Sequence, residues 1–219
     1  MKKIILAIVV LLAIMGIWYF SGRGVSQDAN SDSDNADVMI KETSVEELPD
    51  GAFTLDSQSS ELRWAAERVV GKSHRGDIKI GSGMVEIEDG ALTSGSFVID
   101  MSTITESNSD QMFLEHINSD DFFATDRFST ARLELKSVEK VGESYQVTAD
   151  LTIKDITNEI TFPATISESE GVLTARSEFQ IDRTKWDIVF DSSSVFLTIG
   201  DKAIRDEITF NLVLVVRPS

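Results

Sequence analysis

From residue 51 to residue 219, apolar side chains recur at every second position in one segment after another. Period-two alternation places these side chains on one face of a strand and polar residues on the other, which is typical of antiparallel sheets with one wet face. The final segment, "ITFNLVLVV", shows the pattern with Ile208, Phe210, Leu212, Leu214 and Val216. The alternation predicts an all-β domain over residues 51–219.

Short segments rich in turn residues separate the predicted strands. The pair Asp89-Gly90 in "EDGA" predicts a tight hairpin, and "KVGES" and "SESEGV" are short connections that contain glycine. A meander of about eight strands removes its exposed edges by closing into a barrel. We therefore predict an antiparallel up-and-down β-barrel of about eight strands, with an interior that side chains fill or that holds one small ligand.

One segment, "SNSDQMFLEHINS" at 107–119, departs from the alternation. It opens with several residues suited to a helix N-cap, and Met112, Phe113 and Ile117 then recur at helical spacing. The segment predicts one short helix between two barrel strands. Such a helix would cap one end of the barrel or line the mouth of a cavity.

The N-terminal residues 1–23 predict a membrane anchor. Lys2 and Lys3 precede an apolar run from Ile4 to Phe20 that ends in three aromatic residues, and no Ala-x-Ala cleavage site follows. The run is longer than the core of most secretory signals and reaches the short end of a membrane span. An uncleaved single-pass anchor is favoured over a cleaved signal. In either case the rest of the chain is expected outside the cytoplasm, in the bacterial periplasm for an anchored form.

Residues 24–50 predict a disordered, acidic linker, because eight acidic residues stand against one lysine and apolar residues are few.

The whole chain carries a net charge of −17. This charge argues against nucleic acid as a partner, since phosphate binding needs a basic face. The chain has no cysteine, which excludes disulfides, thiolate metal sites and cysteine nucleophiles.

The stretch "HINSDDFF" at 116–123 allows two interpretations. It could be a catalytic loop in which Asp120 and Asp121 act with His116, or a latch that inserts Phe122 and Phe123 into the interior. Adjacent acids on an extended backbone point to opposite sides, so they make a poor acid/base pair. Aspartate also competes well for turn backbone groups, which favours the latch.

Several motifs, in this order along the chain, resemble those of the YceI-like family of exported bacterial proteins. They are "GKSHRGDIKI" at 71–80, "IDMSTIT" at 99–105, "HINSDDFF" at 116–123, "ADLTIKDITNEITFP" at 149–163, "DRTKWDI" at 182–188 and "GDKAIRDEI" at 200–208. The resemblance covers essentially residues 51–216. One departure concerns a turn, because Asp155 stands where the family has glycine after "LTIK".

The resemblance implies a lipocalin-like barrel with an elongated apolar cavity that takes isoprenoid chains, such as polyprenyl lipids and quinones, or related long-chain amphiphiles. It also implies that Phe122 and Phe123 help to close or line this cavity. The predicted ligand-binding residues are Trp64, Ile80, Phe97, Ile99, Met112, His116, Ile117, Phe122, Phe123, Leu133, Leu135 and Trp186. In a barrel of this size, core and cavity lining are the same set of side chains.

The sequence predicts no catalytic residue, no metal site and no cofactor. The two histidines, His74 and His116, fall short of the three or four ligands of a typical zinc site, and no Gly-x-Ser-x-Gly elbow occurs. We therefore expect a membrane-tethered binding or carrier protein for a long apolar ligand. An enzyme that uses the cavity as a reaction chamber and a ligand-free structural or adhesion barrel are the alternatives. The sequence does not distinguish a monomer from a homodimer.

Overall fold

In a computed structural model, residues 48–219 are described, except for positions 72, 109, 193 and 196–202. The predicted anchor at 1–23 and nearly all of the predicted linker at 24–50 lie outside the described residues. Within the described part of the chain, no helix has the length and apolar character needed to cross a membrane.

Nine strands, one α-helix and two 3-10 helices make up the described elements. In chain order they are β1 (Gly51–Leu55), β2 (Glu61–Arg68), β3 (Ser73–Glu88), β4 (Ala91–Asp100), η2 (Met101–Thr103), α1 (Gln111–Asn118), β5 (Thr130–Val141), β6 (Ser144–Ile153), β7 (Ile156–Ser169), β8 (Val172–Asp182), η3 (Arg183–Trp186) and β9 (Ile204–Pro218).

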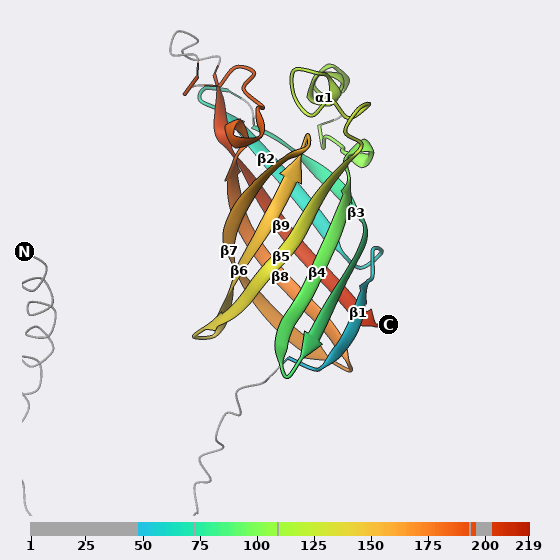
Figure 1. Cartoon of the computed structure of the whole chain (residues 1–219). Coiled ribbons are helices and arrows are strands. Elements are labelled where there is room, and N and C mark those ends of the chain that lie inside the picture. The colour runs from blue at the N-terminus through green and yellow to red at the C-terminus, as the bar shows by residue number, and fades with distance from the viewer. Residues whose placement is uncertain (1–47, 72, 109, 193, 196–202) are drawn as a thin grey trace, which may run out of the picture. The chain divides into compact units, whose positions relative to one another are not determined.

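The strands form one closed antiparallel barrel (Figure 1). Each strand from β2 to β8 pairs with the next strand in sequence, and β9 closes the barrel by pairing with β2, where Trp64 lies opposite Phe210. Closure leaves no long free edge. The predicted up-and-down barrel of about eight strands is thereby confirmed.

β1 and β2 share one position in the barrel wall. Both pair with β3 and with β9, with β1 at one end of these long strands and β2 at the other. The residues between them leave the ladder as a bulge. Asp56 holds the bulge, because its carboxylate accepts hydrogen bonds from the backbone N–H groups of Gln58 and Ser59 and from the guanidinium of Arg217.

Two-residue turns connect several neighbouring strands. Asp89 and Gly90 have φ values of 51° and 72°, as the left-handed turn of a tight hairpin requires, so the predicted turn at "EDGA" is confirmed. The β6–β7 turn adopts the same geometry without glycine, with φ values of 51° at Lys154 and 59° at Asp155. The departure from the family glycine thus leaves the turn in place and puts two non-glycine residues in the left-handed region.

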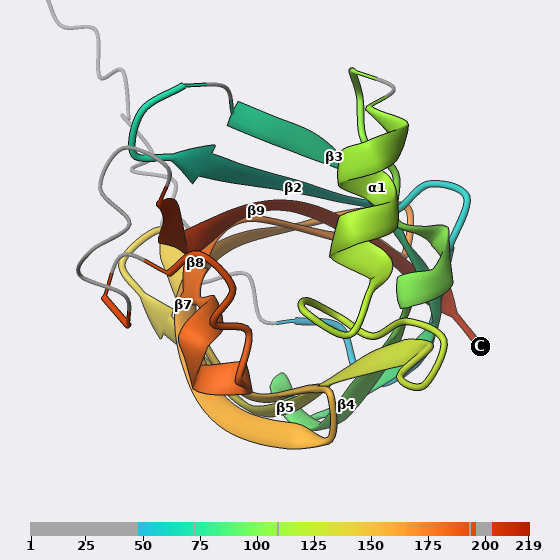
Figure 2. The ribbon, with the colours of Figure 1, turned by 90° about the horizontal axis from the view of Figure 1, so that it is seen from above.

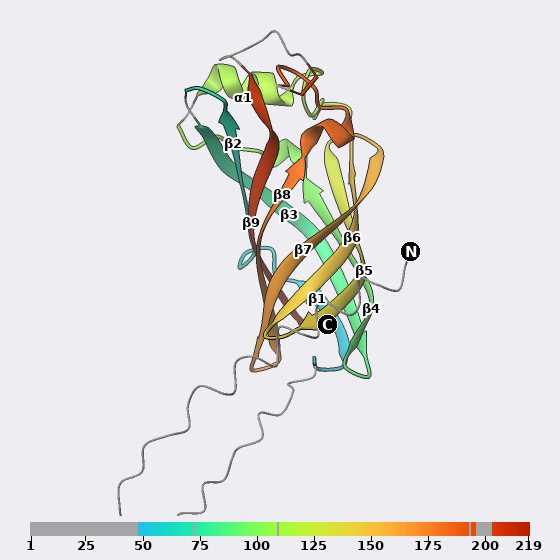
Figure 3. The ribbon, with the colours of Figure 1, turned by 90° about the vertical axis from the view of Figure 1, so that its left-hand side faces the viewer.

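The predicted helix is confirmed, although it is shorter than the 107–119 segment. α1 begins after Asp110, whose carboxylate accepts the N–H of Phe113 at 3.0 Å as an N-cap, and it ends before Ser119. Seen from above and from the side, α1, η3 and the residues 187–192 that follow η3 lie at one end of the barrel (Figures 2 and 3). The chain enters β1 at the opposite end. We call these the upper and lower ends.

Candidate functional site: an apolar tunnel through the barrel

Three cavities follow one another inside the barrel. The lower, middle and upper chambers hold about 750, 730 and 580 Å³ of empty space, openings included. Phe97, Leu133, Leu212 and Leu214 line both the lower and the middle chamber. Ile78, Phe123 and Phe210 line both the middle and the upper chamber. Because neighbouring chambers share lining residues, they lie in series along the barrel interior, and we call this series the tunnel.

Small side chains on the inner face leave this space open. Ala131, Ala164 and Ala175 point inward from three different strands, where larger residues would fill the barrel. Leu212 and Leu214 on β9 are only half-buried although they face inward, since they border the empty space. Among the residues that line the lower and middle chambers, Ser177 alone has a polar side chain.

The tunnel is long compared with an ordinary ligand pocket. Its wall on β9 runs from Ile208 in the upper chamber to Val216 in the lower chamber. Strands rise about 3.4 Å per residue and tilt by about 40° in such barrels, so this stretch corresponds to about 20 Å along the axis. A narrow apolar space of that length suits an extended chain better than a compact molecule.

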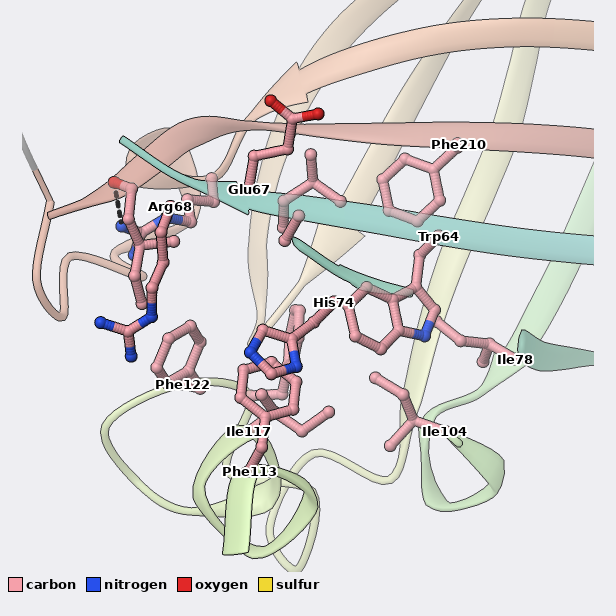
Figure 4. Close-up of a pocket in the computed structure, with 15 residues that line it drawn as sticks. Trp64, Glu67, Arg68, His74, Ile78, Ile104, Phe113, Ile117, Phe122 and Phe210 are labelled. Atoms are coloured by element: carbon pink, nitrogen blue, oxygen red, sulfur yellow. Dashed lines mark hydrogen bonds between the residues drawn. The ribbon is translucent and has the colours of Figure 1, made fainter. Parts of the chain in front are cut away.

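Polar side chains gather around the upper chamber. Glu67, Arg68, His74 and Arg183 line it together with apolar residues, and Glu67 is exposed (Figure 4). The chamber therefore reaches the surface beside the end of β2. In the close-up, the rings of Trp64, His74, Phe113 and Phe122 surround the cavity. The tunnel thus has an apolar interior and an upper mouth that is bordered by charged and aromatic side chains.

His74 joins the barrel wall to α1. Its ring stacks on Phe113, and its Nδ1 lies 3.3 Å from a carboxylate oxygen of Glu106. Glu106 also accepts hydrogen bonds from the backbone N–H groups of Asn108 and Asp110 at 2.7 and 3.0 Å. The bond from Asp110 is the main cause that holds the pKa of Glu106 below its ordinary value, and Asn108 and His74 add to it. This buried carboxylate fixes the chain that leads into α1.

The segment before α1 crosses directly over β3. Thr105 donates its N–H to Asp77, and its carbonyl accepts the indole N–H of Trp64 at 3.2 Å. A Cβ atom at Gly76 would collide with that carbonyl, so only glycine permits the approach. Gly76 thereby lets the segment reach Trp64 and close one side of the upper chamber.

The turn after α1 inserts two rings into the tunnel. Phe122 is buried and lines the upper chamber, and Phe123 lines the upper and middle chambers. Asp120 and Asp121 are both exposed, and Asp120 pairs with Arg127 at 3.0 Å on the surface. This geometry agrees with the latch and places the two acids outside the tunnel.

His116 lies behind the latch in an aromatic cage. Its ring makes edge contacts with Phe122 and Phe190, at centroid distances of 5.2 and 4.4 Å. Its buried Nε2 has no hydrogen-bond partner within the described part of the chain. His116 supports Phe122 from outside the tunnel lining.

Arg183 is a buried cation in the upper chamber wall. Its guanidinium donates hydrogen bonds to the carbonyls of Ile188, Ile204 and Arg205 and to the carboxylate of Asp206. Burial lowers the pKa of Arg183 from its ordinary value, and Asp206 acts in the opposite direction. Burial also raises the pKa of Asp206, but hydrogen bonds from Ser194 and Ser192 and the charge of Arg183 outweigh it, so the pKa lies below its ordinary value. The pair ties η3 to β9.

Nine of the predicted ligand-binding residues line the tunnel. They are Trp64, Ile80, Phe97, Ile99, Ile117, Phe122, Phe123, Leu133 and Leu135. Met112 does not, since its side chain is 80% exposed on the outer face of α1. Trp186 is fully buried in the wall, where its indole donates to the carbonyl of Leu151 at 3.0 Å.

Sequence reasoning missed several lining residues. Phe179 and Phe210 lie on the apolar faces that the alternation identifies, so the signal for them was present. For Arg183 and Leu48 the pattern carries no such signal, because neither stands on an alternating face. Among the described residues, no three His, Cys, Asp or Glu side chains gather closely enough to hold a metal ion.

Comparison with known proteins identifies a family for the barrel domain. The family model described as YceI-like domain matches residues 53–216. The chain is 30% identical over 153 residues to UPF0312 protein SAB2563 of Staphylococcus aureus, a match that covers 64% of this chain and 84% of that protein.

Two solved structures share the fold at low sequence identity. Burkholderia cenocepacia BcnA superposes with a TM-score of 0.59 at 18% identity, over 74% of this chain and 98% of that chain. A polyisoprenoid binding domain from Saccharophagus degradans superposes with a TM-score of 0.56 at 15% identity, over 76% and 98% of the two chains.

Proposed function

The chain belongs to the YceI-like family, and we propose that it binds one long apolar molecule of the isoprenoid class inside its barrel. The observation that carries the proposal is the run of three apolar chambers that share walls from end to end. Protein interiors are normally packed with few voids larger than a water molecule. Three adjoining voids that are lined by leucine, isoleucine and phenylalanine are therefore best explained by an apolar ligand.

Burial supplies the binding free energy in this proposal. Each CH₂ group that moves from water into an apolar site contributes about 0.8 kcal/mol. The lower and middle chambers offer an extended chain almost no polar partner. The polar groups at the upper mouth, Arg68 and His74 among them, would face the head of the ligand. The polyisoprenoid binding domain of Saccharophagus degradans has the same fold, which supports an isoprenoid tail.

The proposed setting is the outer side of the cytoplasmic membrane. The apolar run from Ile4 to Phe20 would anchor the chain, and the acidic residues 24–50 would tether the barrel. A tether raises the effective concentration of the barrel beside the bilayer. The protein would then act as a carrier or a store for a lipid that it exchanges with the membrane.

A titration tests the proposal. The full chain is produced with a protease site inserted ahead of Val45, and the folded barrel is released, stripped of lipid and titrated with a long polyprenol. Native mass spectrometry should show one bound polyprenol per barrel. The variant Ala175→Phe places a ring in the lower chamber and should weaken binding.

The matched control is Thr165→Phe, which adds the same ring to an exposed position of β7. It should bind like the unchanged barrel. Equal binding by both variants, or none by the unchanged barrel, would contradict a ligand inside the tunnel. A barrel that converts the polyprenol into a product would instead favour the enzyme alternative.

A further inference from the structure

The lower end of the tunnel is lined by one residue from outside the sheet. Every other residue of the lower chamber lining comes from strands β3 to β9, whereas Leu48 precedes β1. Leu48 is half-buried and packs against the lower part of the core, which includes Phe53 and Val216. Its side chain therefore occupies the end of the space that the strands leave open.

Two features hold Leu48 in this place. Asp50 accepts the backbone N–H of Gly90 at 2.9 Å and so ties the entering chain to the β3–β4 turn. Pro49 lies between them; its ring fixes its own backbone, and it restricts Leu48 to extended conformations. The side chain of Leu48 is thus positioned by the two residues that follow it, Pro49 and Asp50.

The two ends of the tunnel differ in chemistry. The upper chamber reaches the surface beside the exposed Glu67 and is bordered by charged and aromatic side chains. The lower chamber has an apolar lining that ends at Leu48, Ile87 and Leu92. An extended ligand that entered from the upper mouth would contact Leu48 with its far end.

We propose that the side chain of Leu48 closes the lower end of the tunnel, as its stop, and sets the maximum length of the ligand that the barrel accepts. This inference rests on the proposed function, and it names the residue that gives that site its specificity. Removing the side chain of Leu48 should open the lower end and admit longer chains. A larger side chain at the same position should shorten the tunnel.

Thiol labelling tests the stop without any ligand. The chain has no cysteine, so a single introduced thiol is unique. A175C places a thiol in the lower chamber and A66C places one in the upper chamber. In the full chain, L48A should raise the labelling rate of A175C by an apolar maleimide several-fold and leave A66C unchanged. An equal rise at both positions, or no rise at A175C, would overturn the proposal.

A competition between chain lengths tests the consequence for binding. Farnesol, geranylgeraniol and a longer polyprenol are offered together, and the bound fraction is measured by native mass spectrometry. L48A should shift the bound population toward the longest chain, and L48W toward farnesol. The control V141A truncates an exposed side chain at the lower β5–β6 turn and should bind like the unchanged protein.

The two proposals fail in different ways. If the unchanged protein binds none of the three alcohols, the isoprenoid function is wrong, and the labelling rates still decide whether Leu48 closes the tunnel. If the unchanged protein binds them but L48A and L48W keep its length preference, Leu48 is not the stop and the function stands.

Discussion

The ring of His74 lies almost parallel to the ring of Phe113, with centroids 3.7 Å apart and planes inclined by 5°. His74 belongs to β3 and Phe113 to α1, so this stack fastens the helix to the barrel wall beside the upper chamber. Phe113 also faces Trp64 at a centroid distance of 6.2 Å. Three aromatic side chains from different elements thus define one side of the tunnel mouth.

Truncation of Phe113 should loosen the mouth. Phe113→Ala removes the stack, and we expect a loss of about 1–3 kcal/mol in the free energy of unfolding, as for a partly buried aromatic residue. Release of a bound polyprenol should also become faster. The adjacent Met112 is 80% exposed, so Met112→Ala should change the stability by no more than about 0.5 kcal/mol. Urea denaturation and stopped-flow release measure both effects, and equal results for the two variants would contradict the account.

Removal of Arg183 should be costly. Arg183→Met leaves the carboxylate of Asp206 and three backbone carbonyls without the buried cation that they face. Breaking a buried pair by removing one partner typically costs about 3–5 kcal/mol. Arg127→Met breaks the exposed pair with Asp120 and should cost less than about 1 kcal/mol. Chemical denaturation compares the two, and a similar small loss for both would show that the Arg183 pair is not structural.

Asp56 should make the barrel sensitive to acid. The guanidinium of Arg217 and the hydroxyl of Ser59 lower the pKa of Asp56 from 3.8 to about 2. A lowered pKa means that the charged form is favoured in the folded state, so Asp56 stabilises the barrel above about pH 4 and loses this effect as the pH falls toward 2.

The variant Asp56→Asn isolates this contribution. Its deficit in unfolding free energy relative to the unchanged protein should be largest above about pH 4 and should shrink as the pH falls toward 2. Urea denaturation at stepped pH measures the deficit. A deficit that stays constant over this range would show that the charge of Asp56 is not what closes the bulge between β1 and β2.

The β6–β7 turn should be easy to improve. Asp155 has a φ of 59°, a region that glycine occupies without a steric cost. Asp155→Gly should therefore stabilise the protein by up to about 1 kcal/mol. Gly171 has the same place in the β7–β8 turn with a φ of 78°. A Cβ there would lie 3.7 Å from Cγ of Pro218, an ordinary van der Waals contact, so the cost of Gly171→Ala comes from the backbone and should be of similar size in the destabilising direction. Thermal melting compares the variants; changes of the same sign would contradict the argument.

The barrel could be predicted because the alternation that specifies each strand is visible within a few consecutive residues. Alternation on "YQVTADLTI" or "ITFNLVLVV" fixes which side chains face inward, and the inner face is both core and tunnel lining. The turns at Asp89-Gly90 and Glu170-Gly171 then follow from glycine positions. Family resemblance added the order of motifs and the expectation of a cavity.

The mouth could not be predicted in the same way, because its contacts join distant segments. His116 meets Phe190 only after four strands, β5 to β8, have folded between them. The helical spacing predicted that Met112 faces the barrel. A helix of eight residues buries only one stripe, however, and the stack with His74 places Phe113 on that stripe instead of Met112. Leu48 lies within residues 24–50, whose composition predicts a disordered linker.

The measurement that tests the central claim most directly is the identity of what the barrel carries from a cell. The full chain is produced in a bacterial host, the barrel is released at the inserted protease site without detergent, and an organic extract is analysed by lipid mass spectrometry beside a mock purification. A stoichiometric isoprenoid, reduced in Ala175→Phe and retained in Thr165→Phe, is the predicted result. An empty extract, followed by no uptake of added polyprenols or quinones, would contradict the binding function and leave a ligand-free structural barrel.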